Sequence, residues 1–471
     1  MHIQLQNTLS GRKEEFKPIN SGYVSMYNCG PTVYGRQHLG NLSMFVFTDI
    51  LRRALEYAGF EVKQVINITD FGHLVSDGDL GEDKMTKGLK AEGLDVNMEN
   101  MRALARKYAD IFLSDIKELN IKTEETKFPY ASEYIKEQKK LIEKLEENDF
   151  TYKTSDGIYF DTDKFGNYGK LGNINAPSAK ATAGQARIVE NKEKKNQKDF
   201  VLWKFNADLG WDSKWGKGFP GWHIECTAMI FALLGEQIDI HTGGIEHIPI
   251  HHNNEIAQAE AASGKIPFSR FWLHREHLQI ENEKISKSVG NVLYLSDLKE
   301  HKIHPLSFRY WLLTSRYNTP TNFTWEAVEG AQVALEKIVN EYAQMPEVKF
   351  SPRSLLGKFE EAISDNLNTP VAVSLLQEAI SQPSSAKATA GKEEIDEMNK
   401  ILGLNIRVLA EQIQEIPDEI KDLQKQRDQA RKSEDWKLSD DLRDRIESKG
   451  FRVKDFENKT EIYRTLSSMI I

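Results

Sequence analysis

Hydrophobic and polar positions near the start of the chain follow two different periods. Residues 23–28 and 62–67 are short apolar runs, which are typical of buried strands. Residues 41–59 instead repeat apolar side chains at helical spacing, which predicts an amphipathic helix. The apolar face of this helix holds Phe45, Ile50, Leu51, Ala54, Leu55 and Ala58. A strand, a helix and a second strand in this order predict a βαβ unit, and therefore a parallel sheet in an α/β fold.

The middle of the chain has the character of an insertion into this α/β pattern. Within it we expect, in order, a helix at 133–147, hairpin-like strands at 150–161 and a strand at 200–204 that returns to the core. The sequence therefore predicts a first half of the core at 1–120, a connective insertion at 121–204 and a second half of the core at 205–304.

The last third of the chain changes to helical periodicity. Helices are predicted at 305–316, 323–345, 353–366, 369–381 and 392–413, which together form a helical bundle at 305–416. Pro417 opens a small module at 417–471, with one helix at 420–432 and a second that ends at 448. Trp436 lies between them and is expected to anchor the small core of the module, or alternatively to stack on a nucleic-acid base.

Composition and charge limit the cellular location and the binding partners that we expect for this protein. The chain has 471 residues, a formal net charge of −9 and only two cysteines. No apolar run reaches the length of a membrane span, and the N-terminus lacks the pattern of a secretory signal. We therefore expect a cytoplasmic protein of several domains. The negative charge argues against non-specific binding of nucleic acid, so a nucleic-acid partner requires local basic patches.

Two short motifs have the residue types that ATP chemistry requires. The first, HLGN at 38–41, joins a strand to a helix, where free N–H groups and the helix dipole favour phosphate. His38 can donate to a phosphate oxygen, and Gly40 allows close approach of the backbone. The second, KISKS at 284–288, brings Lys284 and Lys287 on a polar loop to the β- and γ-phosphates. Each motif alone is also consistent with a capping histidine or a solvated basic loop.

A candidate metal site combines residues that are distant in the sequence. Cys29 follows the first strand, and Cys226 lies in GWHIEC. His251 and Glu255 are four residues apart in a predicted helix, so their side chains share a face. Two thiolates, an imidazole and a carboxylate are a plausible zinc set. The spacing by itself favours the alternative, in which both cysteines are small buried hydrophobic residues.

The order of the motifs resembles one family. The chain contains YNCGPTVY at 27–34, HLGN, NITD at 67–70, GWHIEC at 221–226, DIHTGG at 239–244, HHNNEIAQAE at 251–260 and KISKS. This series is similar to the cysteinyl-tRNA synthetases of class I, and the similarity extends through nearly the whole chain. It implies a Rossmann-like catalytic core with an inserted α+β domain, a tRNA-binding helical bundle and a C-terminal anticodon-binding module.

The resemblance also implies the residues of the site and its ligands. One zinc ion per chain would be held by Cys29, Cys226, His251 and Glu255. The substrate cysteine would be contacted by Thr69, Trp222 and His241. Catalysis would depend on His38, Lys284 and Lys287. ATP, with Mg²⁺, would be bound by His38, Gly40, Asn41, Gly243, Gly244, Glu246, Lys284, Ser286, Lys287 and Ser288. The partners implied are L-cysteine, ATP and tRNA(Cys), with the protein acting as a monomer.

The chain departs from the family pattern at three places. Asn41 stands where the first ATP motif usually has a second histidine, and asparagine donates a hydrogen bond but cannot become cationic. Glu246, a candidate contact to the ATP ribose, replaces the usual aspartate. A longer acidic loop occupies 71–85, as in a subset of the family.

Two other functions are weighed against tRNA charging. A homologous ligase makes the same adenylate but transfers cysteine to an amino-sugar, and it lacks the terminal module. A non-catalytic RNA-binding paralogue would show eroded site residues, whereas His38, Lys287 and the metal ligands are all present. Residues 417–471 therefore favour tRNA, with phosphate contacts predicted at Lys425, Arg427, Arg431 and Lys432.

Overall fold

The structure is a computed structural model that describes residues 1–71, 84–173, 192–285, 290–345, 347, 355–381, 391–455 and 460–470. Its centre is a parallel sheet with the strand order β10-β9-β3-β4. These strands are β3 Tyr23–Asn28, β4 Glu61–Ile66, β9 Ile238–Gly244 and β10 Ser269–Arg275. The parallel sheet confirms the α/β fold class that the sequence predicts.

Helices cover the faces of this sheet because each one connects parallel strands. The helix α1, Leu39–Tyr57, joins β3 to β4, and α6, Asn253–Ser263, joins β9 to β10. The remaining elements of the core are β1 Gln4–Asn7, β2 Arg12–Glu15, α2 Lys84–Ala91, α3 Met98–Glu118, α5 Trp222–Leu233, β11 Leu278–Ile280, β12 Glu283–Lys284, α7 Leu295–Glu300 and β13 Thr321–Phe323.

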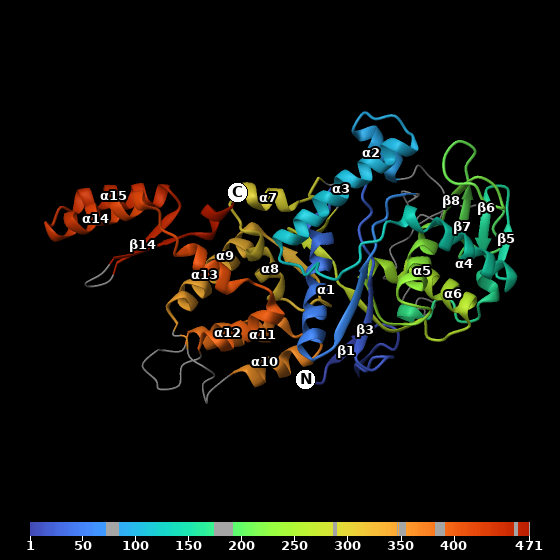
Figure 1. The fold of residues 1–471 in the computed structure, drawn as a ribbon, viewed down its shortest axis with the longest axis horizontal. Helices are drawn as coiled ribbons and strands as arrows, with labels where there is room; N and C mark the ends of the chain where they lie inside the picture. The colour runs from blue at the N-terminus through green and yellow to red at the C-terminus, as the bar shows by residue number, and fades with distance from the viewer. Residues whose placement is uncertain are drawn as a thin grey trace.

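The insertion forms its own antiparallel sheet beside the core (Figure 1). It contains α4 Ile135–Glu147 and the strands β5 Thr151–Lys153, β6 Gly157–Phe160, β7 Phe200–Phe205 and β8 Gly218–Pro220. The predicted return to the core at 200–204 is wrong, because β7 pairs with β6 and β8. Leu202 and Trp203 are fully buried in the apolar cluster of the insertion, so this packing determines where the strand belongs.

A bundle of helices packs against the core. Its helices are α8 Pro305–Leu313, α9 Trp325–Gln344, α10 Leu356–Ser364, α11 Thr369–Ile380, α12 Lys392–Leu402 and α13 Ile406–Ile413. The prediction of one helix at 392–413 is wrong, because Gly403 and Asn405 adopt φ values of +63° and +52°. A left-handed residue cannot continue an α-helix, and Gly403 ends α12 as its C-cap.

The C-terminal module lies at one end of the molecule, opposite the insertion (Figure 1). It consists of α14 Asp418–Lys432, α15 Trp436–Ser448 and the antiparallel strands β14 Phe451–Asp455 and β15 Thr460–Arg464. Its small core is formed by Ile420, Leu423, Leu442, Ile446, Phe451 and Ile462. The expectation that Trp436 anchors this core is wrong, because Trp436 is 58% exposed. Among the described residues, no helix is both long and apolar enough to cross a membrane.

Candidate active site

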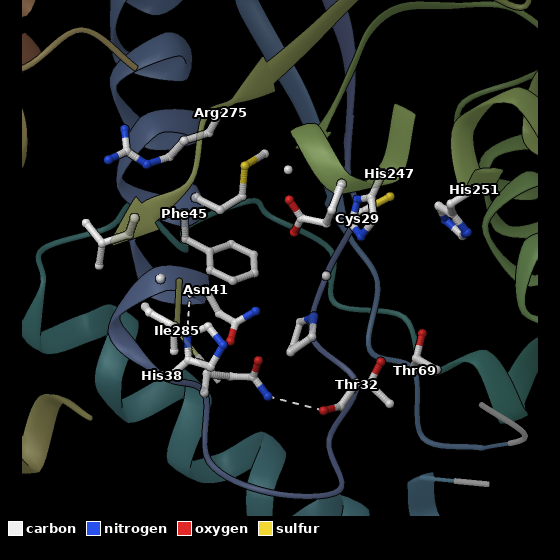
Figure 2. Close-up of a pocket in the computed structure, with 18 of the residues that line it drawn as sticks. Cys29, Thr32, His38, Asn41, Phe45, Thr69, His247, His251, Arg275 and Ile285 are labelled. Atoms are coloured by element: carbon white, nitrogen blue, oxygen red, sulfur yellow. Dashed lines mark hydrogen bonds between the residues drawn. The ribbon is translucent and has the colours of Figure 1, made fainter. Parts of the chain in front are cut away.

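A pocket of about 390 Å³ opens at the carboxyl ends of the parallel strands, where α/β sheets bind their ligands. It brings together most of the predicted site residues from both halves of the core. Those that line it are Cys29, His38, Gly40, Asn41, Thr69, Trp222, Cys226, Gly244, Glu246, His251 and Lys284. Figure 2 shows His38, Asn41 and Ile285 grouped on one side of this pocket and Cys29, His247 and His251 on the other.

The N-terminus of α1 forms the first side of the pocket. The helix begins at Leu39, slightly earlier than predicted, and His38 is its N-cap: the His38 Nδ1 accepts the Asn41 N–H at 3.2 Å. A Cβ at Gly40 would lie 2.9 Å from Ile285 Cδ1 and 3.0 Å from the His38 ring. A larger residue at this position would therefore force the Ile285 side chain and the His38 ring to shift.

Two glycines at the end of β9 lie in close contact with side chains near the pocket. A Cβ at Gly244 would lie 2.3 Å from the carboxylate oxygens of Glu246, and a Cβ at Gly243 would lie 2.5 Å from the His252 ring. Glu246 lies at the pocket, with its carboxylate 3.8 Å from His277 Nδ1. Gly243 lies behind the pocket wall, against His247 and His252, rather than among the lining residues.

The second ATP motif is only partly described. Lys284 is an exposed residue at the end of β12 and lines the pocket. Ser286, Lys287 and Ser288 lie outside the described residues, as does most of the loop at 71–85.

The four predicted metal ligands come together at the other side of the pocket. The donor atoms of Cys29, Cys226, His251 and Glu255 all lie within 4.8 Å of one another, and all four residues are buried. His251 Nε2 is 2.8 Å from Glu255 Oε1 and 3.6 Å from Cys226 Sγ. His251 and Glu255 therefore lie side by side, as their spacing of four residues predicts. The segment Ile248–His252, which precedes α6, is a π-helical turn.

A second group of donors overlaps the first. Cys29, His241, His252 and Glu255 also lie within 4.8 Å of one another. His241 Nε2 is 3.0 Å from Glu255 Oε2, and His252 Nε2 is 3.3 Å from Cys29 Sγ. His241, predicted as a contact to the substrate cysteine, is therefore a fully buried neighbour of Glu255 and does not line the pocket.

Charges within this cluster support one another. Burial opposes ionisation of Glu255, but His241 and His251 outweigh it and lower the pKa of Glu255 to about 2. A hydrogen bond from Cys29 lowers the pKa of Cys226 to about 6, whereas burial raises the pKa of Cys29. These contacts favour a carboxylate at Glu255 and a thiolate at Cys226, and they raise the pKa of His251 to about 10, so binding of a divalent cation would release the His251 proton.

Aromatic and polar side chains surround the cluster on the pocket side. The Trp222 ring stacks on His251, with 4.2 Å between ring centroids and 27° between planes. Thr69 is oriented from two directions: its hydroxyl accepts from Asn67 Nδ2 at 3.1 Å and donates to Glu225 at 3.3 Å.

Some residues of the site were not predicted from the sequence. Lys84, His247, His252 and Arg275 line the pocket or the donor cluster. His252 had a signal, because it adjoins His251 in the same motif. Lys84 and Arg275 had none, since neither lies in one of the motifs on which the resemblance rests.

Comparisons with known proteins identify the family of this chain. A family model described as tRNA synthetases class I (C) catalytic domain matches residues 15–333. Cysteine–tRNA ligase 1 of Burkholderia lata is 39% identical over 464 residues, which cover 97% of this chain and 95% of that protein.

The chain belongs to the cysteine–tRNA ligase family. The cysteine–tRNA ligase of Treponema denticola is also 39% identical and is covered over 99% of its length, with 98% of this chain. The relative from Caldicellulosiruptor saccharolyticus is 37% identical and covered completely, over 98% of this chain.

A solved structure supports the fold alone. A methionyl-tRNA synthetase of Mycobacterium tuberculosis, in complex with methionyl-adenylate, superposes with a TM-score of 0.56 at 13% identity. The match covers 83% of this chain and 91% of that chain. The fold is therefore that of a class I aminoacyl-tRNA synthetase.

Proposed function

We propose that this protein activates L-cysteine with ATP and transfers it to tRNA(Cys). In the first step a carboxylate oxygen of cysteine forms a bond to the α-phosphorus of ATP. The bond from that phosphorus to the oxygen bridging the β-phosphate breaks, and pyrophosphate leaves with the electron pair. In the second step a ribose hydroxyl at the 3′ end of tRNA attacks the acyl carbon, loses its proton, and AMP leaves.

The observation that carries this proposal is the composition of one pocket. A helix N-terminus with His38 and Gly40, and the cation Lys284, lie across it from a buried cluster of thiol, imidazole and carboxylate donors. The first side suits a triphosphate, bound as its Mg²⁺ complex. The second side suits a substrate with a soft side chain.

We propose that zinc is the resident metal and that Cys29, Cys226, His251 and Glu255 hold it. The fit is supported by the ionised forms of Cys226 and Glu255 and by the burial of all four residues. When bound, zinc supplies a borderline-soft Lewis acid that prefers the thiolate of cysteine to the hydroxyl of serine. The Trp222 ring and the Thr69 hydroxyl, both at the pocket, would then confine the rest of the substrate.

We propose that His38, Lys284 and Lys287 stabilise the charge that develops on the phosphates, with Gly40, Asn41, Ser286 and Ser288 lining the nucleotide. Glu246 and Gly244 would form the ribose side, and Gly243, predicted for the same role, would act from behind them because it does not line the pocket. His241 would act through Glu255, since its imidazole is 3.0 Å from that carboxylate.

The tRNA is proposed to lie along the bundle at 305–416 and the module at 417–471. Trp436 supports this idea because its exposed ring lies 5.9 Å from the Arg431 guanidinium and is open to stacking by a base. Arg427, expected to contact phosphate, is instead buried and bonds both carboxylate oxygens of Asp455, at 2.7 and 2.8 Å. We therefore exclude Arg427 because it is buried. We keep Lys425, Arg431 and Lys432 as phosphate contacts because their side chains are partly or fully exposed, although Arg431 also pairs with Asp455 at 3.1 Å.

Truncation separates the two halves of this proposal. A chain that ends at Glu415 keeps the pocket, so cysteine-dependent pyrophosphate exchange should be unchanged. Charging of tRNA should fall and should lose part of its salt dependence. Equal charging by both chains across a salt series would reject the module as a tRNA-binding element. It would also remove the main sequence argument against transfer to an amino-sugar.

The substrate assignment is tested by pyrophosphate exchange with a panel of amino acids. We expect exchange with cysteine and at least about 10⁴-fold less with serine, because a well-used polar contact discriminates by that order. Serine exchange within about tenfold of cysteine, in samples checked for contaminating cysteine, would reject thiol-based selection. We expect this activity in the cytoplasm and from a monomer, whose molecular mass can be measured by light scattering.

A further inference from the structure

We propose that Lys84 binds the α-carboxylate of the amino-acid substrate and offsets its repulsion from the α-phosphate of ATP. This inference rests on the proposed function and assigns a residue that neither ATP motif nor the metal set includes. Lys84 is the first residue of α2 and lines the pocket.

The position of Lys84 is set by the rest of its helix. Met85 and Leu89 are fully buried and pack in an apolar cluster with Val33, Ile68 and Phe71. A Cβ at Gly88 would lie 2.7 Å from the carbonyl oxygen of Tyr34, so α2 makes a close contact with the segment between β3 and α1. The buried face thus holds α2 in place, and its first residue is directed to the pocket rim. Figure 1 shows α2 at the N-terminal end of α3.

The ammonium of Lys84 lies on the amino-acid side of the pocket. Its Nζ is 5.8 Å from the centroid of the Trp222 ring. The same ring stacks on His251, one of the candidate metal ligands, at a centroid distance of 4.2 Å. Lys284 and His38, the residues proposed for the phosphates, belong to β12 and to the N-cap of α1, which are different elements of the pocket wall.

The chemistry of cysteine then connects these positions. Only two carbon atoms separate the sulfur of cysteine from its carboxyl carbon. A substrate whose sulfur lies at Cys29, Cys226 and His251 must therefore place its carboxylate close to Trp222 and within reach of a cation beside that ring. Activation brings this carboxylate into bonding contact with an anionic phosphate, so a fixed positive charge at that point lowers the barrier.

Paired ligands isolate this contact. Cysteamine keeps the thiol and the amine of cysteine but lacks the carboxylate. Binding of both compounds is measured by calorimetry without ATP, so that no reaction occurs. We expect Lys84→Met to weaken cysteine binding about 10- to 100-fold, as for a lost charge-assisted hydrogen bond, and to leave cysteamine binding within about twofold. Lys84→Arg should retain most of the preference for cysteine.

The matched control is Lys87→Met, which removes a lysine from the exposed face of the same helix. It should bind both compounds as the unmodified chain does. An unchanged preference for cysteine in Lys84→Met would overturn the proposal. Normal cysteine binding and exchange with impaired tRNA charging would also overturn it and would assign Lys84 to the acceptor end of tRNA. Failure of the proposed function is distinguishable, because the unmodified chain itself would then show no exchange with cysteine.

Discussion

Loss of Arg309 should weaken the packing of the catalytic core against the helical bundle. This residue is fully buried in α8, and its guanidinium reaches the α1 residue Asp49 at 2.5 Å. It also donates to the carbonyl oxygens of Leu402 at 2.8 Å and Leu119 at 3.0 Å. Burial lowers the pKa of Arg309 to about 10, so the group remains charged at neutral pH.

The expected cost of Arg309→Met follows from these contacts. Two buried carbonyl oxygens lose their donor, at about 1–3 kcal/mol each. Asp49 keeps two other partners, the Arg53 side chain at 2.7 Å and the backbone N–H of Lys122 at 2.8 Å. Asp49 therefore does not become an isolated buried charge, and we expect a loss of about 3 kcal/mol in the free energy of unfolding.

Urea unfolding at neutral pH, followed by both fluorescence and exchange activity, measures this loss. The control is Arg316→Met, which breaks a half-exposed ion pair with Asp365 at 3.9 Å. It should change stability by less than about 1 kcal/mol. Activity and fluorescence of Arg309→Met should both be lost at lower urea than in the control. If the two variants unfold at the same urea concentration, Arg309 does not join the core to the bundle.

Three further variants test separate parts of the site. Cys29→Ser removes a donor that both candidate metal groups share, so bound zinc should fall from about one per chain to near zero, as measured by elemental analysis. If the unmodified chain is purified under reducing conditions and is active without zinc, the metal site is rejected. Lys287→Ala should lower the exchange rate about 10²–10³-fold with little change in the KM for cysteine, and near-normal turnover would refute its role. Trp436→Ala should raise the KM for tRNA about tenfold, since stacking contributes about 1–3 kcal/mol per base, and should leave exchange unchanged. An unaltered KM for tRNA would remove Trp436 from the interface.

The parts of the fold that could be predicted are those that local periodicity determines. The strand at 23–28 and the bundle helices follow from apolar spacing, and the structure has them within a few residues. The pairing of β7 could not be predicted, because an apolar strand fits either sheet and only the packing of Trp203 decides between them. The break between α12 and α13 depends on the left-handed backbone at Gly403 and Asn405, which helical periodicity does not reveal.

Side-chain environment was the harder part of the site to predict. The proximity of His251 and Glu255 could be predicted, since the two residues are four positions apart in one helical segment. Arg427 and Trp436 were assigned the wrong exposure. The carboxylate of Asp455 makes burial of Arg427 favourable, and it lies on a strand after the second helix. Its charge alone predicts that Arg427 is exposed, and its hydrophobicity alone predicts that Trp436 is buried. The structure shows the reverse for both residues.

Transfer of radioactive cysteine to tRNA tests the central claim most directly. The full chain is incubated with [³⁵S]cysteine, ATP, Mg²⁺ and bulk tRNA, and the label on precipitated tRNA is counted before and after mild alkali. We predict label that depends on ATP and on tRNA and that alkali releases, as expected for an ester at the 3′ end. Cysteine-dependent pyrophosphate exchange without any label on tRNA would contradict the assignment and would favour a ligase that transfers cysteine to a small acceptor.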